Sequence, residues 1–178
     1  ITLWRFVGLP QDRTADNLGR DILENTAPGA ILLMSQDTAL FTTQYVRYVL
    51  GVRPDTAVIH AARLPITGYQ ASLIKYFPRL TFPDATPATY VEAFIKANRT
   101  PSQRIYSNVI LPAGEGGYWV PRGMLYEAIP FAELPDDEVM YQEAKAHLAS
   151  LHDPRSGILK RYEHLMLSDV SDVYGHAA

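Results

Sequence analysis

Polar side chains follow two apolar runs of this sequence, at the points where the runs end. They are Ser35, Gln36, Asp37 and Thr38 after the first run, and His60 and Arg63 at the end of the second. If both runs are parallel strands, their carboxyl ends meet at one edge of a sheet, where α/β proteins bind ligands. Asp37 could there accept hydrogen bonds from sugar hydroxyls or bind a cation, and His60 could act as an acid, a base or a ligand contact. These six are the candidate ligand-binding residues, and Asp84 is expected at the same face.

Each of these residues also has a structural interpretation, which the sequence leaves open. Asp37 or Ser35 can cap the helix that follows, by accepting a hydrogen bond from an unpaired backbone N–H group. His60 can be a hydrogen-bonded histidine of the core. No other histidine stands at a metal-ligand spacing from His60, so we expect no metal site and no cofactor.

Well-known catalytic motifs are absent from the sequence. There is no cysteine, which excludes a thiolate nucleophile and an iron–sulfur cluster. The glycine-rich segment 114–117 lacks the lysine of a phosphate-binding loop, and neither GxGxxG nor GxSxG follows the first apolar run. We therefore predict no catalytic residue. Whether the chain is an enzyme by itself stays open at this point.

The composition is that of a globular protein. The chain has 178 residues, of which 47% are hydrophobic and 20% charged, with a net charge of -3. Without a basic surplus, nucleic acid is not an expected partner. No apolar stretch approaches the ~20 residues that span a bilayer. A start at Ile1 suggests a processed chain or part of a longer one.

Helices and strands are predicted to alternate along the chain. Continuous apolar runs predict buried strands at 30–34 and 56–61, of the kind found in parallel sheets. Helical spacing predicts helices at 14–24, 40–50 and 68–77 and a helix from Thr86-Pro87, while further strands are expected at 79–82 and 104–111. Segments 118–120 and 124–129 read as an antiparallel hairpin around Pro121-Arg122-Gly123.

Several local features are predicted with these elements. Thr14 or Asp16 is expected to cap the first helix, and Gly51 to end the second in a left-handed conformation. Arg53-Pro54-Asp55 is predicted to form a structural turn. Two apolar helix faces are expected to point inward, namely Phe41, Tyr45, Tyr48 and Val49 in the second helix, and Leu73, Ile74 and Phe77 in the third.

The fold class that follows is a three-layer α/β protein. Its sheet is expected to be mainly parallel and Rossmann-like, with an antiparallel hairpin extension and a C-terminal helical hairpin. The predicted organisation is an α/β domain at 1–130, a proline-marked acidic linker at 131–137 and a helical tail at 138–178. The tail helices, expected at 138–151 and 158–177, could begin a helical repeat.

Four short motifs occur in one order along the chain. They are Pro28-Gly29-Ala30-Ile31-Leu32, then Asp37-Thr38 with Phe41 and Tyr45, then Gly51-Val52-Arg53-Pro54-Asp55 with Val58, and Val120-Pro121-Arg122-Gly123-Met124-Leu125-Tyr126. In these motifs the chain resembles the bacterial protein O-mannosyltransferase-like membrane glycosyltransferases, a family long labelled as of unknown function. The chain departs from the family at Gln36, where a glycine is usual, and after His60, where the family commonly has an asparagine- and aromatic-bearing stretch.

The resemblance implies a role outside the cytoplasm. In this family a multi-helix membrane part carries the catalytic carboxylate and uses a polyprenyl-phosphate sugar. The chain would then be the soluble extracytoplasmic domain of such an enzyme, inactive alone, which recognises the acceptor or covers the active site. Its partners would be the membrane part of the same polypeptide and a protein or glycan acceptor.

Two other functions fit the same residues. A freestanding α/β sugar- or nucleotide-binding module, or a small hydrolase, would need a deep pocket at the Asp37 and His60 edge. A protein-interaction module would instead use the tail helices and expose an apolar stripe at Val170, Val173 and Ala177.

Overall fold

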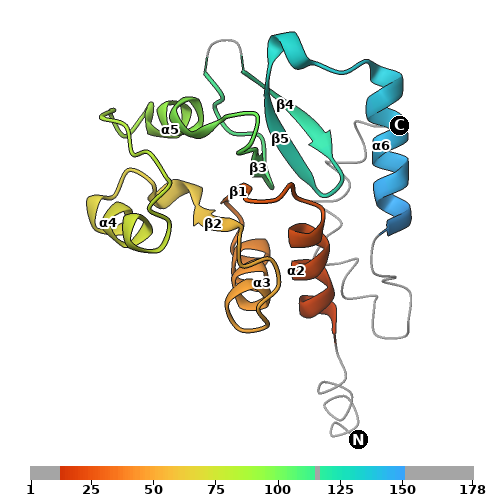
Figure 1. Cartoon of the computed structure of the whole chain (residues 1–178), viewed down its shortest axis with the longest axis horizontal. Helices are drawn as coiled ribbons and strands as arrows, with labels where there is room; N and C mark the ends of the chain where they lie inside the picture. Colours follow the sequence, from red (N-terminus) through yellow and green to blue (C-terminus); the bar gives the residue numbers. More distant parts are fainter. Residues whose placement is uncertain (1–12, 115–116, 151–178) are drawn as a thin grey trace, which may run out of the picture.

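A computed structural model describes residues 13–114 and 117–150 of the chain, and the structural statements below concern these residues. Ten helices and strands follow in the order α2 (Thr14–Glu24), β1 (Ile31–Met34), α3 (Asp37–Tyr48), β2 (Ala57–His60), α4 (Thr67–Tyr76), α5 (Tyr90–Asn98), β3 (Ile105–Ser107), β4 (Gly117–Arg122), β5 (Leu125–Pro130) and α6 (Asp137–Ser150). Two short 3₁₀ turns, Ala61–Arg63 and Phe131–Glu133, follow β2 and β5 (Figure 1).

The five strands form one mixed sheet in the order β2-β1-β3-β5-β4. β1 pairs in parallel with β2, so that Met34 lies opposite His60, and in parallel with β3, so that Leu33 lies opposite Ser107. β5 is antiparallel to both β3 and β4. The predicted α/β class with a parallel core and a hairpin extension is therefore confirmed. The second tail helix, predicted at 158–177, lies outside the described residues.

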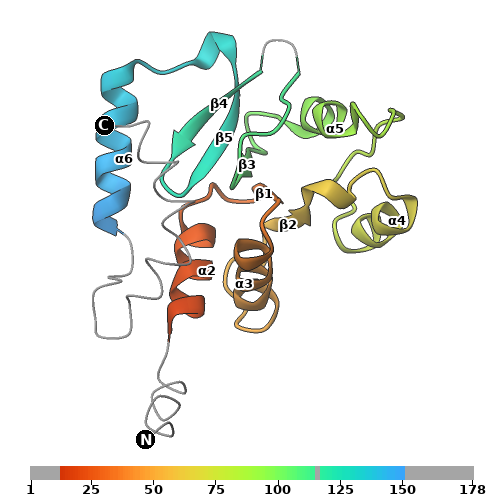
Figure 2. The same cartoon turned by 180° about the vertical axis from the view of Figure 1, so that it is seen from behind.

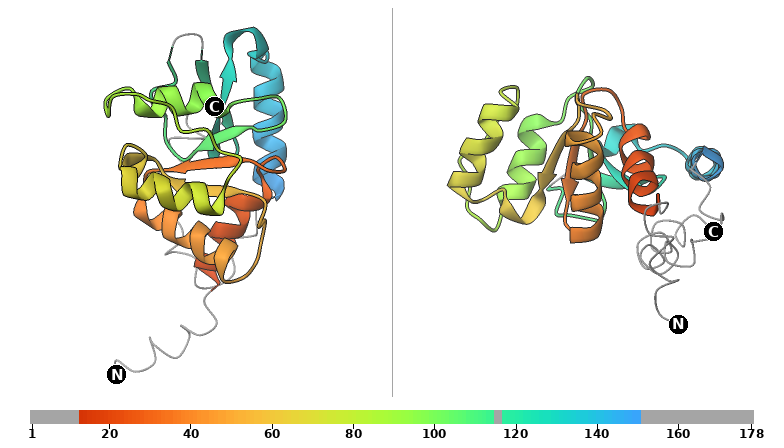
Figure 3. Two further views of the ribbon diagram at one scale, coloured as in Figure 1. Left: turned by 60° about the vertical axis from the view of Figure 1, so that its left-hand side comes forward. Right: turned by 90° about the horizontal axis from the view of Figure 1, so that it is seen from below.

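Helices cover both faces of the parallel strands (Figures 2 and 3). Residues 32, 34 and 58 of β1 and β2 share one buried cluster with apolar side chains of α2 and α3. Residues 31, 33 and 59 share the other cluster with side chains of α4 and α5. Successive residues of a strand face opposite sides, so both sides of β1 and β2 are buried. This is why the sequence of these strands is apolar without alternation.

The helix α3 buries a different face from the predicted one. Its buried side chains are Ala39, Leu40, Thr43 and Val46, whereas Phe41, Tyr45, Tyr48 and Val49 are exposed, so the predicted inward face was wrong. α3 packs closely on α2, where a Cβ atom added to Gly19 would lie 2.5 Å from Val46 Cγ2. Small and β-branched side chains suit this close approach, and large aromatic ones do not.

The turn between α3 and β2 ties together three parts of the chain. Gly51 has φ +70°, the left-handed conformation predicted for it, and Arg53 adopts φ 48°. The Arg53 guanidinium donates hydrogen bonds to three carbonyl oxygens at the end of α2, those of Leu23 (3.0 Å), Thr26 (2.8 Å) and Ala27 (2.8 Å). Arg53 therefore caps the carboxyl end of α2, where the last carbonyl groups of a helix have no hydrogen-bond donor within the helix.

Asp55 completes this turn. Its carboxylate accepts hydrogen bonds from Arg53 Nη2 (2.9 Å) and from the backbone N–H of Gly29 (2.6 Å), just before β1. The hydrogen bonds from Arg53 hold the pKa of Asp55 well below its usual range, and the Gly29 N–H acts in the same direction. The predicted structural role of Arg53-Pro54-Asp55 is thus confirmed.

Segment 79–82 is not a strand, contrary to the prediction. The buried side chain of Asn98 takes the place of a neighbouring strand there. Its Oδ1 accepts from the backbone N–H of Thr81 (2.8 Å), and its Nδ2 donates to the Thr81 carbonyl (2.7 Å). One side-chain amide thus satisfies both backbone groups of Thr81 without a neighbouring strand.

Three details of the helices also differ from the predictions. Asp16 forms an ion pair with Arg13 (2.8 Å), and Arg13 occupies the cap position of α2 without a capping side-chain bond. α5 begins at Tyr90, after a turn that includes Thr86. Ile74 of α4 is exposed, while Leu73 is buried as predicted.

The hairpin and α6 form the other end of the molecule. Gly123, at φ +64°, lies in the turn between β4 and β5 and confirms the predicted hairpin. α6 runs beside β4 (Figures 1 and 2). Among the described helices, none combines the length and the apolar character needed to cross a membrane.

Candidate functional site

The structure places the six predicted site residues at the carboxyl ends of β1 and β2. Ser35 and Gln36 connect β1 to α3, and Asp37 and Thr38 begin α3 with exposed side chains. His60 is the last residue of β2, and Arg63 is exposed in the 3₁₀ turn that follows. Gln36 holds the cap position of α3, and its side chain makes no capping hydrogen bond. Asp84 is exposed between α4 and α5.

A residue that the sequence analysis did not single out joins two of these positions. Asn108 directly follows β3 and is buried. Its Oδ1 accepts from the backbone N–H of Ser35 (2.8 Å), and its Nδ2 donates to Gln36 Oε1 (2.8 Å). The prediction of a strand through 111 concealed Asn108, because it placed the residue inside the strand instead of after its carboxyl end.

Asn108 lies at the point where the sheet topology reverses. From β1 the chain passes through α3 to β2 on one side, and later returns through α4 and α5 to β3 on the other side of β1. Loops diverge at such a point, and α/β proteins bind ligands in the crevice between them. Here the amide of Asn108 spans the loops after β1 and β3, with hydrogen-bond donors and acceptors.

His60 lies one strand further along the same edge. Its backbone N–H donates to the hydroxyl of Tyr69 (2.9 Å), a residue of α4. Burial raises the pKa of Tyr69, so this hydroxyl stays protonated at neutral pH and has a hydrogen to donate. Nδ1 of His60 is buried without a hydrogen-bond partner among the described residues. The edge thus carries an amide pair, an imidazole and a phenol, which can exchange hydrogen bonds with the hydroxyl groups of a ligand.

The described residues contain no group of three or more histidine, aspartate or glutamate side chains that could hold a metal ion. The polar atoms of the edge come from amide, imidazole, hydroxyl and backbone groups, together with the exposed side chains of Asp37 and Arg63. Such groups bind and orient a ligand by hydrogen bonds.

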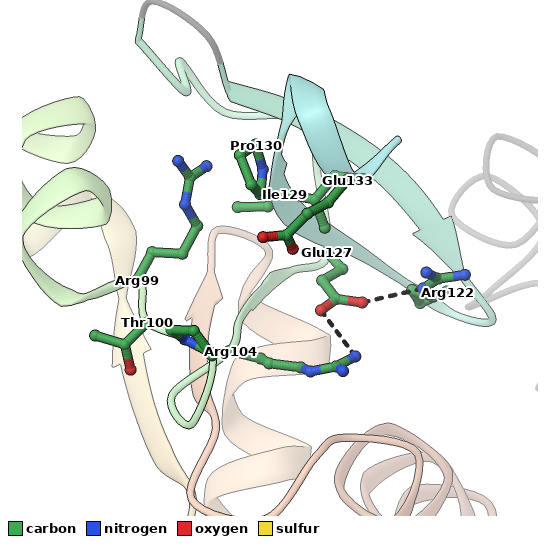
Figure 4. Close-up of a pocket in the computed structure, with 10 residues that line it drawn as sticks. Arg99, Thr100, Arg104, Arg122, Glu127, Ile129, Pro130 and Glu133 are labelled. Carbon is green, nitrogen blue, oxygen red and sulfur yellow. Dashed lines mark hydrogen bonds and ion pairs between the residues drawn. The ribbon is translucent and has the colours of Figure 1, made fainter. Parts of the chain in front are cut away.

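A cavity of about 480 Å³ lies at the opposite edge of the parallel strands (Figure 4). It is lined by Arg99, Thr100, Pro101, Arg104, Arg122, Glu127, Ala128, Ile129, Pro130 and Glu133. Arg104 immediately precedes β3, and its carbonyl accepts from the backbone N–H of Ile31 at the start of β1 (2.9 Å). None of the residues predicted to bind a ligand lines this cavity.

The largest charge cluster of the cavity centres on Glu127. This side chain is 5% exposed and accepts hydrogen bonds from Arg104 Nη1 (3.2 Å) and Arg122 Nε (3.0 Å). Arg122 also pairs with Glu143 of α6. Burial, and next the charge of Glu127, raises the pKa of Tyr106, which lies opposite Glu127 in the sheet. The cluster fastens the hairpin to β3 and to α6.

Neither a protein-family model nor a curated protein nor a solved structure matches this chain significantly.

Proposed function

We propose that this chain is the accessory domain of a membrane-embedded glycosyltransferase and recognises the acceptor. In this proposal the domain lies on the extracytoplasmic face and is not catalytic alone. The membrane part of the same polypeptide carries the reaction and uses a lipid-linked sugar. The resemblance of the four ordered motifs to the O-mannosyltransferase-like family supports this proposal.

The arrangement around Asn108 is the observation that carries the acceptor-recognition role. The Asn108 amide bridges Ser35 and Gln36 at the topological switch point, where a ligand can exchange hydrogen bonds with it. An amide pair offers donors and acceptors side by side, which matches the mixed character of a sugar hydroxyl. The unpaired Nδ1 of His60 extends the same hydrogen-bonding edge.

Two of the motifs have structural roles at the amino ends of β1 and β2, opposite this edge. The turn before β2 is formed by Gly51-Val52-Arg53-Pro54-Asp55 and is held by hydrogen bonds of Arg53 and Asp55. The first half of β1 and the residues before it are Pro28-Gly29-Ala30-Ile31-Leu32. Both therefore position the strands whose carboxyl ends form the edge. A freestanding sugar-binding module would use the same edge, and only the presence of a membrane part separates the two proposals.

The first test reads the coding sequence upstream of Ile1. Several apolar segments of ~20 residues are expected. A start codon or a secretory signal directly before Ile1 would overturn the transferase proposal and leave the freestanding module.

The second test measures sugar transfer by the full-length protein in membranes. Asn108→Ala should raise the KM for the acceptor about 10-fold, the equivalent of one lost hydrogen bond. Asn17→Ala, the same chemical change on α2, should leave the KM unchanged. Thermal unfolding checks that the Asn108→Ala variant is folded. If the folded variant has an unaltered KM, the acceptor does not bind at this edge.

A further inference from the structure

Arg99 differs from the other two arginines of the cavity in having no acidic partner among the described residues. Arg104 and Arg122 share Glu127, as described above. Nη1 of Arg99 is buried and has no hydrogen-bond partner among the described residues. A buried guanidinium N–H without an acceptor is costly, and each such group in a native protein needs an explanation, such as an unseen water or ion. An anion bound in the cavity would supply the missing acceptor.

The surroundings of Arg99 hold it in place for such a ligand. Arg99 directly follows α5, and its backbone N–H donates to the carbonyl of Ile95 (2.9 Å). A Cβ atom added to Gly117, at the start of β4, would lie 3.4 Å from Arg99 Nη1. The guanidinium thus reaches from the end of α5 to the hairpin. It also lines a second cavity, of about 320 Å³, together with Lys96.

The rest of the lining indicates what else the ligand must carry. Figure 4 shows the Arg99 guanidinium apart from the cluster around Glu127, with the Glu133 carboxylate pointing into the space between them. Glu133 and the hydroxyl of Thr100 can bond to hydroxyl groups of a ligand. Ala128, Ile129, Pro130 and Pro101 supply apolar surface, as in typical small-molecule sites.

We propose that this cavity binds a small polyhydroxylated anion, a sugar acid or a sugar phosphate, with its acidic group on Arg99. A planar guanidinium binds a carboxylate or a phosphate through two parallel hydrogen bonds. The cavity volume falls within the range of roughly 300–1,000 Å³ for small-molecule sites. The site is separate from the Asn108 edge and does not depend on the function proposed for it.

The test titrates the 178-residue chain with four probes at an ionic strength of about 0.15 M, which screens distant surface charges: glucuronate, glucose 6-phosphate, glucose and inorganic phosphate. Binding is followed by calorimetry and by amide NMR shifts. One or both sugar anions should bind at least about 10-fold more tightly than glucose and than inorganic phosphate, because the acidic group and the hydroxyls both contribute. The stronger of the two sugar anions identifies the acidic group as carboxylate or phosphate.

Three variants assign the binding to Arg99. Arg99→Gln should weaken the sugar anion at least about 10-fold, and Arg99→Lys should recover part of the loss because it keeps the charge without the fork. Lys96→Gln removes the same charge one turn earlier on α5, outside the larger cavity, and should change the affinity less than about 2-fold. The Arg99 guanidinium has no partner among the described residues, so its variants should unfold at the wild-type temperature or above it.

Several results would overturn the proposal. Equal binding of glucose would show that Arg99 does not select an anion. Equal binding of inorganic phosphate would show an adventitious ion only. Equal losses of affinity in Arg99→Gln and Lys96→Gln would show that the ligand is attracted by general surface charge. Amide NMR shifts at Asn108 rather than around Ile129 would place the ligand at the other edge of the sheet. These outcomes leave the transfer assay and the upstream sequence unaffected, so the two proposals can fail separately.

Discussion

Replacement of Arg53 by alanine is expected to destabilise the fold more than a typical surface substitution. Arg53 donates hydrogen bonds to the carbonyls of Leu23, Thr26 and Ala27 and pairs with Asp55. Its side chain is only 21% exposed, so water does not fully replace these partners in the variant. The substitution therefore removes the contact between the end of α2 and the turn before β2.

The magnitude follows from which carbonyls keep another donor. The Leu23 carbonyl still accepts from the Thr26 hydroxyl (2.8 Å), and the Ala27 carbonyl from the backbone N–H of Ala30 (3.2 Å). The Thr26 carbonyl accepts no other hydrogen bond from the described residues. The bond to the Thr26 carbonyl is lost in full, which costs ~1.5–3 kcal/mol for a charge-assisted hydrogen bond. The bonds to the Leu23 and Ala27 carbonyls cost less, because each carbonyl keeps another donor. The free energy of unfolding should therefore fall by about 2–4 kcal/mol. This corresponds to about 5–15 °C in Tm for a domain of this size.

Arg53→Gly separates the hydrogen bonds from the backbone strain. Arg53 has φ 48°, a conformation that costs about 1–2 kcal/mol for a residue with a Cβ atom. The glycine variant loses the same hydrogen bonds but not this cost, so it should be more stable than the alanine variant by about 1 kcal/mol.

Urea unfolding followed by circular dichroism measures all three proteins. If Arg53→Ala loses less than about 0.5 kcal/mol, as ordinary surface substitutions do, the proposed role of this turn is wrong. If the glycine variant is less stable than the alanine variant, the assignment of strain to Arg53 fails.

Two further predictions concern the same half of the molecule. Gly19→Ala should lower the free energy of unfolding by about 1–2 kcal/mol in thermal unfolding, because the clash with Val46 exceeds the gain in helix propensity. The control Gly68→Ala, in open space on α4, should be neutral or stabilising. Equal effects of the two substitutions would contradict the close α2–α3 contact. Asp55→Asn should lower the free energy of unfolding by about 1–2 kcal/mol at pH 7. The loss is smaller than for a buried ion pair, because the carboxylate is 39% exposed. The pKa of Asp55 is lowered in the folded state, so its contribution is complete above the unfolded pKa of about 3.9 and is lost as the pH falls further. The stability difference between Asp55→Asn and wild type, measured from pH 7 down to pH 2, should therefore shrink below about pH 4, and a constant difference would refute the assigned cause.

The parallel core could be predicted because its strands have an unambiguous pattern. Segments 31–34 and 57–60 are apolar on both faces, and a helix of suitable length separates them. The position of the candidate edge follows directly, since polar residues begin where each apolar run ends. Asn108 was missed because the polar Ser107 already stands within β3, so the change from strand to loop has no clear signal.

The buried face of α3 was mispredicted because the helix has two apolar faces. The buried Ala39, Thr43 and Val46 repeat with the same helical spacing as the exposed Phe41, Tyr45 and Tyr48. The aromatic set has the larger side chains, and a pattern read from α3 alone favours it. The close approach of α2 at Gly19 decides in favour of the smaller set, and this approach is a property of two helices.

The arginine-lined cavity depends on pairing between segments far apart in the chain. Tyr106 pairs with Glu127, and this register brings Arg104 to the carboxylate, while the hairpin register brings Arg122 to its other side. A shift of one residue would turn Glu127 to the opposite face of the sheet and separate it from both arginines. Because Arg104 and Arg122 already occupy Glu127, that carboxylate is not available to Arg99. The same pairing that stabilises the hairpin thus leaves one cation available, and only the assembled sheet reveals which arginine it is.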